Sequence, residues 1–244
     1  MTLLVQEISP SHKKSLEKLA TKNVHINIFK INYEMVNPIH NSQENYLRVQ
    51  FFTMLIFYRL FIPELFPQYN KAIYLDADTI INTDLAEIFN IEIGENMFAS
   101  CPDLSIRYMP LLQEYITKCQ GIFSPEKYIN NGVIIFNMKA FRDKKFIQRF
   151  YYLIEKYHFD NIDPDQAYMN EICEKQIYHL PKEWDAMPNE NLPEFPNPKI
   201  VHYNLFFKPW HFKDLQYGEY FWKVAQKTEF YDELKAELNN FTDE

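Results

Sequence analysis

Short apolar strands alternate with helices along this chain, and that alternation limits the possible folds more than any other feature. The strand candidates span residues 1–9, 24–31, 71–76, 97–101, 133–137 and 199–203. The helix candidates span residues 10–20, 42–62, 138–157 and 163–173, and two amphipathic helices are expected in residues 216–241. Such alternation predicts an α/β fold with a mostly parallel, mixed sheet flanked by helices. In such folds ligands bind at the carboxyl ends of the strands.

The division of the chain follows from the same pattern. We expect one α/β domain over residues 1–212 and a C-terminal helical extension, residues 213–244, packed on it. The helix over 42–62 is expected to end before Pro63, because a proline disfavours the helical conformation of the residue before it.

The composition excludes several classes of function. A net charge of −8 argues against nucleic acid as a partner and against a polybasic membrane anchor. The four glycines lie too far apart for a dinucleotide-binding turn or a Walker A loop, and the three cysteines have no CxxC spacing. We recognise no signal peptide and no membrane-spanning run. We therefore expect a cytoplasmic protein, with at most a peripheral contact at the inner face of a membrane.

Two carboxylates lie at the carboxyl end of the strand over 71–76. Asp76 and Asp78 flank Ala77 at the end of the apolar run KAIYL, and the period of a strand places both acids on one side. Two anionic oxygens at the edge of a sheet suit a divalent cation. An acidic turn is the simpler interpretation, but the apolar strand before the pair favours metal binding.

The segment YLDADTI also fits the first motif of haloacid-dehalogenase-type phosphatases. In that interpretation Asp76 is a phosphorylated nucleophile and Asp78 a general acid and base. That motif normally opens its domain, whereas strands precede it here. The phosphatase stays as the weaker alternative.

A histidine and a lysine follow the last strand. His202 ends the run KIVHY, and Lys208 comes six residues later. An imidazole beside two carboxylates favours Mn²⁺ over ions that prefer oxygen ligands alone, and Lys208 has the length and charge to reach a phosphate oxygen. A strand-end histidine is more often structural, so the argument depends on its pairing with Asp76 and Asp78.

Two polar pairs complete the set. Asn130 and Asn131 precede Gly132 and a buried strand, where amides are suited to bind sugar hydroxyls, although a plain turn is equally consistent. Asp165 and Gln166 begin a helix, where a carboxylate also has the simpler role of stabilising the helix dipole.

The four motifs together, in this order, resemble glycosyltransferase family 8, which includes bacterial lipooligosaccharide galactosyltransferases and glycogenin. The resemblance extends from the first strand to about Trp210. Its most specific segments are YLDADTIIN, NNGVIIFN, DPDQAYMN and HYNLFFKPW. It implies the nucleotide-sugar transferase fold called GT-A, and a retaining transfer of glucose or galactose from a UDP-sugar. The implied acceptor is a glycan or glycolipid, such as lipopolysaccharide.

The resemblance also implies roles for single residues. Asp76, Asp78 and His202 look like the protein ligands of Mn²⁺, with Mg²⁺ as the alternative ion. The donor-binding residues would be Arg59, Asp76, Ala77, Asp78, Asn130, Asn131 and Lys208, with Lys208 at the diphosphate. Asp165 and Gln166 match the pair beside the anomeric carbon, which makes them the catalytic candidates.

Two departures accompany the resemblance. Ala167 stands where the family has Asp or Gly after the Asp-Gln pair. By this resemblance, the chain begins at the family's second strand, without the first strand and its acidic loop. A non-catalytic, truncated remnant is therefore a further alternative to an active transferase.

Overall fold

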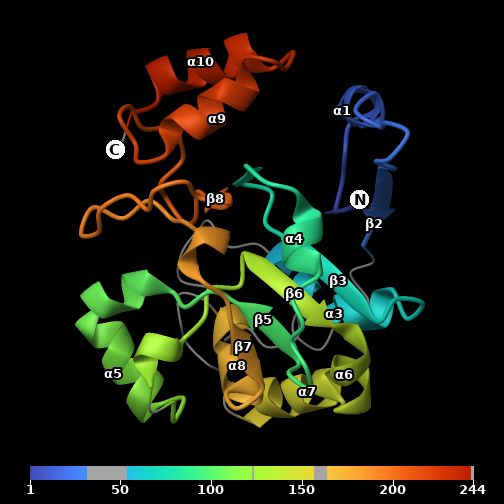
Figure 1. Ribbon diagram of the computed structural model, residues 1–244, viewed down its shortest axis with the longest axis vertical. Helices are drawn as coiled ribbons and strands as arrows, with labels where there is room; N and C mark the ends of the chain where they lie inside the picture. Colours follow the sequence, from blue (N-terminus) through green and yellow to red (C-terminus); the bar gives the residue numbers. More distant parts are fainter. Residues whose placement is uncertain (32–53, 123, 157–163, 243–244) are drawn as a thin grey trace.

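A four-stranded sheet covered by helices forms the centre of the protein (Figure 1). The computed structural model describes residues 1–31, 54–122, 124–156 and 164–242. The strands are β1 (Thr2–Val5), β2 (Asn27–Lys30), β3 (Lys71–Leu75), β4 (Thr79–Ile81), β5 (Phe98–Ser100), β6 (Val133–Asn137), β7 (Ile177–His179) and β8 (Ile200–His202). The α-helices are α1 (Pro10–Glu17), α3 (Tyr58–Leu65), α4 (Leu85–Phe89), α5 (Pro110–Lys118), α6 (Met138–Asp143), α7 (Phe146–Lys156), α8 (Pro164–Cys173), α9 (Gly218–Ala225) and α10 (Tyr231–Asn240). Short 3-10 helices are η3 (Met54–Phe57), η4 (Leu104–Tyr108), η5 (Pro125–Lys127) and η6 (Lys182–Trp184).

Strand β6 is buried on both faces, which explains its uninterrupted apolar sequence. Ile134 and Phe136 face one core, where they pack with residues of α3, α6, α7 and α8. Val133 and Ile135 face the opposite core, beside Ile88 of α4. Successive residues of a strand point to opposite faces, so one strand joins both cores and fixes the layers around the sheet.

The expected mixed sheet flanked by helices is confirmed, but antiparallel pairs outnumber parallel ones among the described strands. The order of the central sheet is β3-β6-β5-β7, and β6 runs antiparallel to both β3 and β5. Strand β5 pairs with β7 in parallel, as β1 does with β2. Strands β4 and β8 form a separate antiparallel pair. The insertion of β6 between β3 and β5 is the reason why the expected parallel majority is wrong.

Two helices differ from the sequence expectation. The expected helix over 42–62 lies partly outside the described residues, and its described end, α3, continues through Pro63 to Leu65. The helix continues because the backbone N–H groups after the proline still make helical hydrogen bonds. Phe66 N, for example, donates to Ile62 O at 3.1 Å. The expected helix over 138–157 is two helices, α6 and α7, because Lys145 between them has a positive φ of 54°. The expected start of α8 at Asp163 lies outside the described residues.

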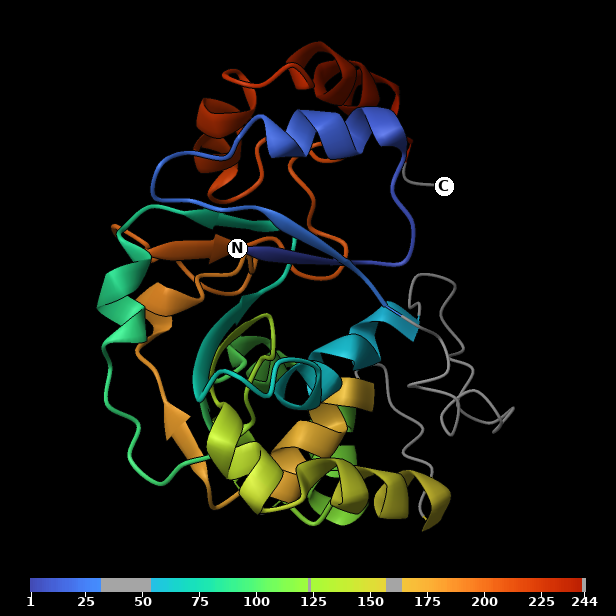
Figure 2. The same ribbon diagram turned by 90° about the vertical axis from the view of Figure 1, so that its right-hand side faces the viewer.

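The C-terminal residues pack on the α/β part. Tyr217 lies in one apolar cluster with Tyr203, and the Tyr203 hydroxyl donates to Tyr217 O at 2.6 Å. Helix α1 also lies beside the C-terminal helices (Figure 2). The rings of His12 and Phe230 are 6.0 Å apart there. In the described part of the chain, no helix combines the length and apolarity needed to cross a membrane.

Candidate active site

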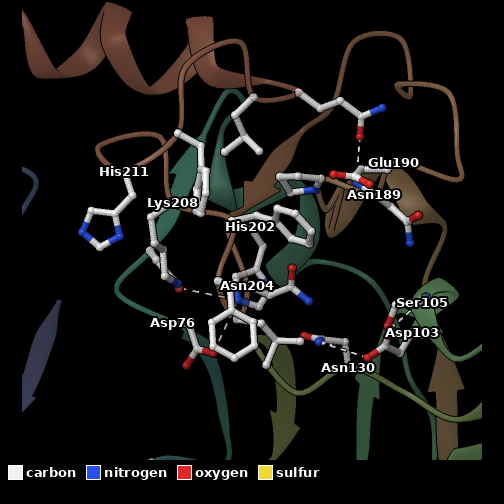
Figure 3. Close-up of a pocket in the computed structure, with 18 of the residues that line it drawn as sticks. Asp76, Asp103, Ser105, Asn130, Asn189, Glu190, His202, Asn204, Lys208 and His211 are labelled. Carbon is white, nitrogen blue, oxygen red and sulfur yellow. Dashed lines mark hydrogen bonds and ion pairs between the residues drawn. The ribbon is translucent and has the colours of Figure 1, made fainter. Parts of the chain in front are cut away.

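A cavity of about 1170 Å³ opens above the sheet, between its strand ends and the C-terminal segment (Figure 3). Nine of the predicted site residues line it: Arg59, Asp76, Asp78, Asn130, Asn131, Asp165, Gln166, His202 and Lys208. Ala77, which the resemblance also implies as a donor-binding residue, does not line it and is exposed. The four sequence motifs thus meet at one cavity.

The pairing of β4 with β8 brings the histidine to the two carboxylates. Thr79, the first residue of β4, is directly opposite His202, the last residue of β8. Tyr203 N also donates to Asp78 O at 3.0 Å. The sequence argument placed Asp76 and His202 at the carboxyl edge of one mostly parallel sheet. They meet instead because the start of one strand faces the end of its antiparallel partner.

Asp76, Asp78 and His202 form a group that could hold a divalent metal ion. One ligand atom from each residue lies within 4.8 Å of the others. His202 Nε2 is 3.6 Å from Asp76 Oδ2 and 3.5 Å from Asp78 Oδ1. One nitrogen and two carboxylate oxygens suit an ion such as Mn²⁺, which accepts both ligand types. The donor set therefore fits the expected ion.

The charge of the histidine depends on buried acids. His202 Nδ1 lies 3.1 Å from Asp185 Oδ1. Burial alone would lower the pKa of the imidazole, but the charge of Asp185 and its hydrogen bond, together with Asp78, raise that pKa to about 10. Nδ1 is engaged with Asp185, so Nε2 is the nitrogen that faces the cavity.

Lys208 lies next to the proposed metal ligands. Its ammonium donates to Asp78 Oδ2 and, at 2.5 Å, to Tyr203 O. Burial would raise the pKa of Asp78, but hydrogen bonds and charges of His202 and Lys208 hold it far below its ordinary value. Asp78 is therefore a fully ionised carboxylate at neutral pH.

Arg59 connects the metal group with the start of α8. The arginine is buried and contacts Asp76 through both terminal nitrogens, at 3.2 and 3.1 Å. It also donates to Asn131 O at 2.7 Å and to Asn131 Oδ1 at 3.0 Å. The Tyr74 hydroxyl donates to Asp76 Oδ1, the same oxygen that one of these nitrogens contacts. These contacts fix the orientation of Asp76.

Asn131 holds the two catalytic candidates. Asn131 Nδ2 donates to Asp165 Oδ2 at 2.6 Å, and Asn131 N donates to Gln166 Oε1 at 3.2 Å. Asp165 and Gln166 are both buried at the first turn of α8. Burial raises the pKa of Asp165 above its ordinary value, although Arg59 and Asn131 oppose that shift. The motifs at 130–131 and 165–166 therefore form one hydrogen-bonded unit.

Two acids that belong to this site were missed from the sequence. Asp103 accepts from Gln166 Nε2 at 3.3 Å and lies 3.5 Å from Asn130 Nδ2. It stands just after β5, so the strand-end rule applied to that strand would have found it. Asp185, which contacts His202, follows η6, and no local sequence pattern marks it.

Apolar side chains also line the cavity. Ile106 of η4, Met109 between η4 and α5, and Leu112 of α5 line it, and so do Phe206 and Phe212 from the segment after β8. A ligand here therefore meets both charged groups and apolar side chains.

Comparisons with known proteins agree with this architecture. The profile of glycosyl transferase family 8 matches residues 1–214. A putative glycosyltransferase of Haemophilus influenzae is 25% identical over 173 residues, which are 68% of this chain and 51% of that protein. Lipopolysaccharide 1,2-glucosyltransferase of Escherichia coli is 21% identical over 227 residues, 87% of this chain and 64% of that protein. The chain thus spans about half the length of the first of these relatives.

Solved structures share the fold. The apo structure of the bifunctional glycosyltransferase WbbM matches with a TM-score of 0.80 at 23% identity, covering 98% of this chain and 46% of that one. The galactosyltransferase LgtC, in complex with donor and acceptor sugar analogues, matches with a TM-score of 0.70 at 19% identity, covering 99% and 84%. These likenesses confirm the expected GT-A-like fold. With the profile match over residues 1–214, they show that the chain belongs to glycosyltransferase family 8.

Proposed function

We propose that the protein is a retaining hexosyltransferase that moves glucose or galactose from a UDP-sugar to a glycan acceptor with Mn²⁺. The convergence of Asp76, Asp78 and His202 at the lining of one cavity carries this proposal. The family match covers the same Asp-Ala-Asp segment, which argues against the phosphatase alternative.

The diphosphate of the donor is proposed to lie at the metal group. A divalent ion held by Asp76, Asp78 and His202 would act as a Lewis acid on the leaving diphosphate. Lys208 adds a positive charge at the same place, since its ammonium already lies against Asp78. A protein with a net charge of −8 needs such local cations to admit an anionic donor.

The sugar is proposed to lie between the asparagine pair and the start of α8. Asn130 and Asn131 offer amide groups there, and the side chains of Asp165 and Gln166 are fixed by the hydrogen bonds described above. Gln166 is a poor nucleophile, so we favour attack on the same face that the diphosphate leaves. The acceptor hydroxyl would then transfer its proton to the departing phosphate.

The acceptor is proposed to be a surface glycan or glycolipid, such as the core of lipopolysaccharide. The relative from Escherichia coli is named a lipopolysaccharide glucosyltransferase, which supports this class. The apolar side chains of Ile106, Met109 and Phe206 in the cavity lining are suited to the carbon face of a sugar ring.

Calorimetric titration of UDP into the purified chain, with Mn²⁺ and again with EDTA, tests the proposal. We expect binding that requires Mn²⁺, followed by hydrolysis or transfer when UDP-glucose or UDP-galactose is supplied. A folded sample that binds no UDP in either condition would contradict the donor assignment and favour a non-catalytic chain.

A further inference from the structure

We propose that Asp185 and Gly132 are positioning residues for His202. Together they direct its Nε2 at Asp76 and Asp78 and give the metal group its preference for an ion that accepts nitrogen. The inference rests on the proposed function, since it concerns the metal group of that site.

Asp185 holds the histidine from the side opposite the metal group. Its side chain is fully buried, with 0% of its surface exposed, and its Oδ1 lies 3.1 Å from His202 Nδ1. A carboxylate that accepts from Nδ1 of a histidine leaves Nε2 as the nitrogen for a metal and limits rotation of the ring. The observed direction of Nε2, toward Asp76 and Asp78, is the consequence of this contact.

The second carboxylate oxygen of Asp185 does not tie this side chain to any other described group. Within the described ranges, its Oδ2 makes no hydrogen bond. A buried carboxylate with so few partners is costly, because it has lost its hydration. His202 Nδ1, 3.1 Å from Oδ1, is its hydrogen-bond partner, so this acid is matched to the histidine rather than to the surrounding backbone.

Gly132, the residue before β6, lies against the ring from another segment of the chain. A Cβ at this position would lie 2.1 Å from Cε1, 2.6 Å from Nδ1 and 2.7 Å from Nε2 of His202. Such distances are far below van der Waals contact, so any side chain here must displace the imidazole. The backbone of His202 cannot follow easily, since its N–H donates to Ala186 O at 2.9 Å in the β4–β8 layer. Gly132 therefore contributes the space that the ring occupies.

A ring fixed in this way makes the metal group selective. Two carboxylates alone suit Mg²⁺ and Mn²⁺ alike, whereas a correctly placed imidazole favours Mn²⁺. Displacing the ring should therefore weaken Mn²⁺ strongly and Mg²⁺ much less. Loss of a group that orients a ligand typically weakens metal affinity about 10- to 100-fold.

The test measures Mn²⁺ affinity by the electron paramagnetic resonance signal of free Mn²⁺, in the presence of UDP, and Mg²⁺ affinity by competition. Asp185→Leu, Asp185→Asn and Gly132→Ala are compared with His202→Ala. Asp143→Asn, an exposed acid, and Gly218→Ala, where a Cβ meets nothing closer than 3.9 Å, are the matched controls. Circular dichroism establishes that each variant is folded.

We expect Asp185→Leu and Gly132→Ala to weaken Mn²⁺ about 10- to 100-fold and to lower the ratio of Mn²⁺ to Mg²⁺ affinity, as His202→Ala does. Asp185→Asn keeps an oxygen acceptor for Nδ1 and should lie in between. Pulsed resonance at saturating Mn²⁺ should show nitrogen coupling in the native protein and the controls, and reduced coupling in the positioning variants.

The outcomes separate this inference from the proposed function. If His202→Ala weakens Mn²⁺ while folded Asp185→Asn and Gly132→Ala bind it like the native protein, the positioning role is wrong and the metal site stands. If His202→Ala itself binds Mn²⁺ like the native protein, the metal group of the proposed function is wrong. Asp185→Asn changes no volume, so the test does not depend on the folding of Asp185→Leu.

Discussion

The Nε atom of Arg59 lies 3.1 Å from Oδ2 of Asp165, and both side chains are buried. The terminal nitrogens of the same guanidinium contact Asp76. One cation therefore compensates two carboxylates, one at the end of β3 and one at the start of α8. The proposed metal ligands and the proposed catalytic pair are parts of one electrostatic network.

Replacement of the arginine should destabilise the fold strongly. Arg59→Met leaves the buried Asp165 and the partly exposed Asp76 without their cation, and loss of one partner of a buried ion pair costs about 3–5 kcal/mol. Urea denaturation measures this change in the free energy of unfolding. The double variant with Asp165→Asn should recover part of the loss, because it removes one uncompensated charge. Strictly additive losses would show that the two side chains are not coupled.

The pH dependence of that loss has a definite sign. Burial raises the pKa of Asp165, opposed by Arg59. Without Arg59 the pKa of the acid should rise further above its ordinary value of about 3.9. A carboxyl whose pKa is raised by folding costs stability once the pH exceeds its pKa in the unfolded chain. The cost grows with pH until the carboxyl is ionised in the folded chain as well. Arg59→Met should therefore lose less stability at pH 5 than at pH 8, and an equal loss at both would contradict this account.

Much of the site could be predicted because its residues follow apolar strands. Asp76 and Asp78 come after KAIYL, and His202 ends KIVHY, so a strand-end rule placed them at the same cavity. Their proposed roles, and the division of the chain after residue 212, stay predictions.

The geometry that joins these residues could not be predicted. Strand β4 has three residues, too few for a periodic signal, yet its antiparallel pairing with β8 is what brings His202 to the two acids. Asp185 follows a single 3-10 turn, so its contact with His202 depends on tertiary packing alone. Pattern rules report local periodicity and carry little information about which short strands pair.

Removal of one proposed metal ligand should separate binding from folding. Asp78→Ala is expected to abolish Mn²⁺-dependent UDP binding, because Asp78 is one of only two carboxylates in the group. The pKa of its carboxyl is held far below the ordinary value by His202 and Lys208, so its removal should lower the melting temperature while the chain stays folded. Calorimetry with Mn²⁺ and thermal unfolding measure the two effects, with Asp143→Asn as the control acid. Unchanged UDP affinity in Mn²⁺ would remove Asp78 from the metal group.

Lys208 is assigned to the diphosphate, so removing it should lower affinity only for ligands that carry phosphates. Hydrogen bonds to charged groups contribute about 1.5–3 kcal/mol, which corresponds to roughly 10- to 150-fold in affinity. Lys208→Ala should weaken UDP by that factor and uridine hardly at all, as measured by calorimetry with Mn²⁺. Lys213→Ala is the matched control, since Lys213 lines the same cavity a few residues further along the chain. Equal losses of affinity for UDP and uridine would place Lys208 at the nucleoside. If Lys213→Ala weakened UDP as much as Lys208→Ala, the effect would come from the net charge of the cavity.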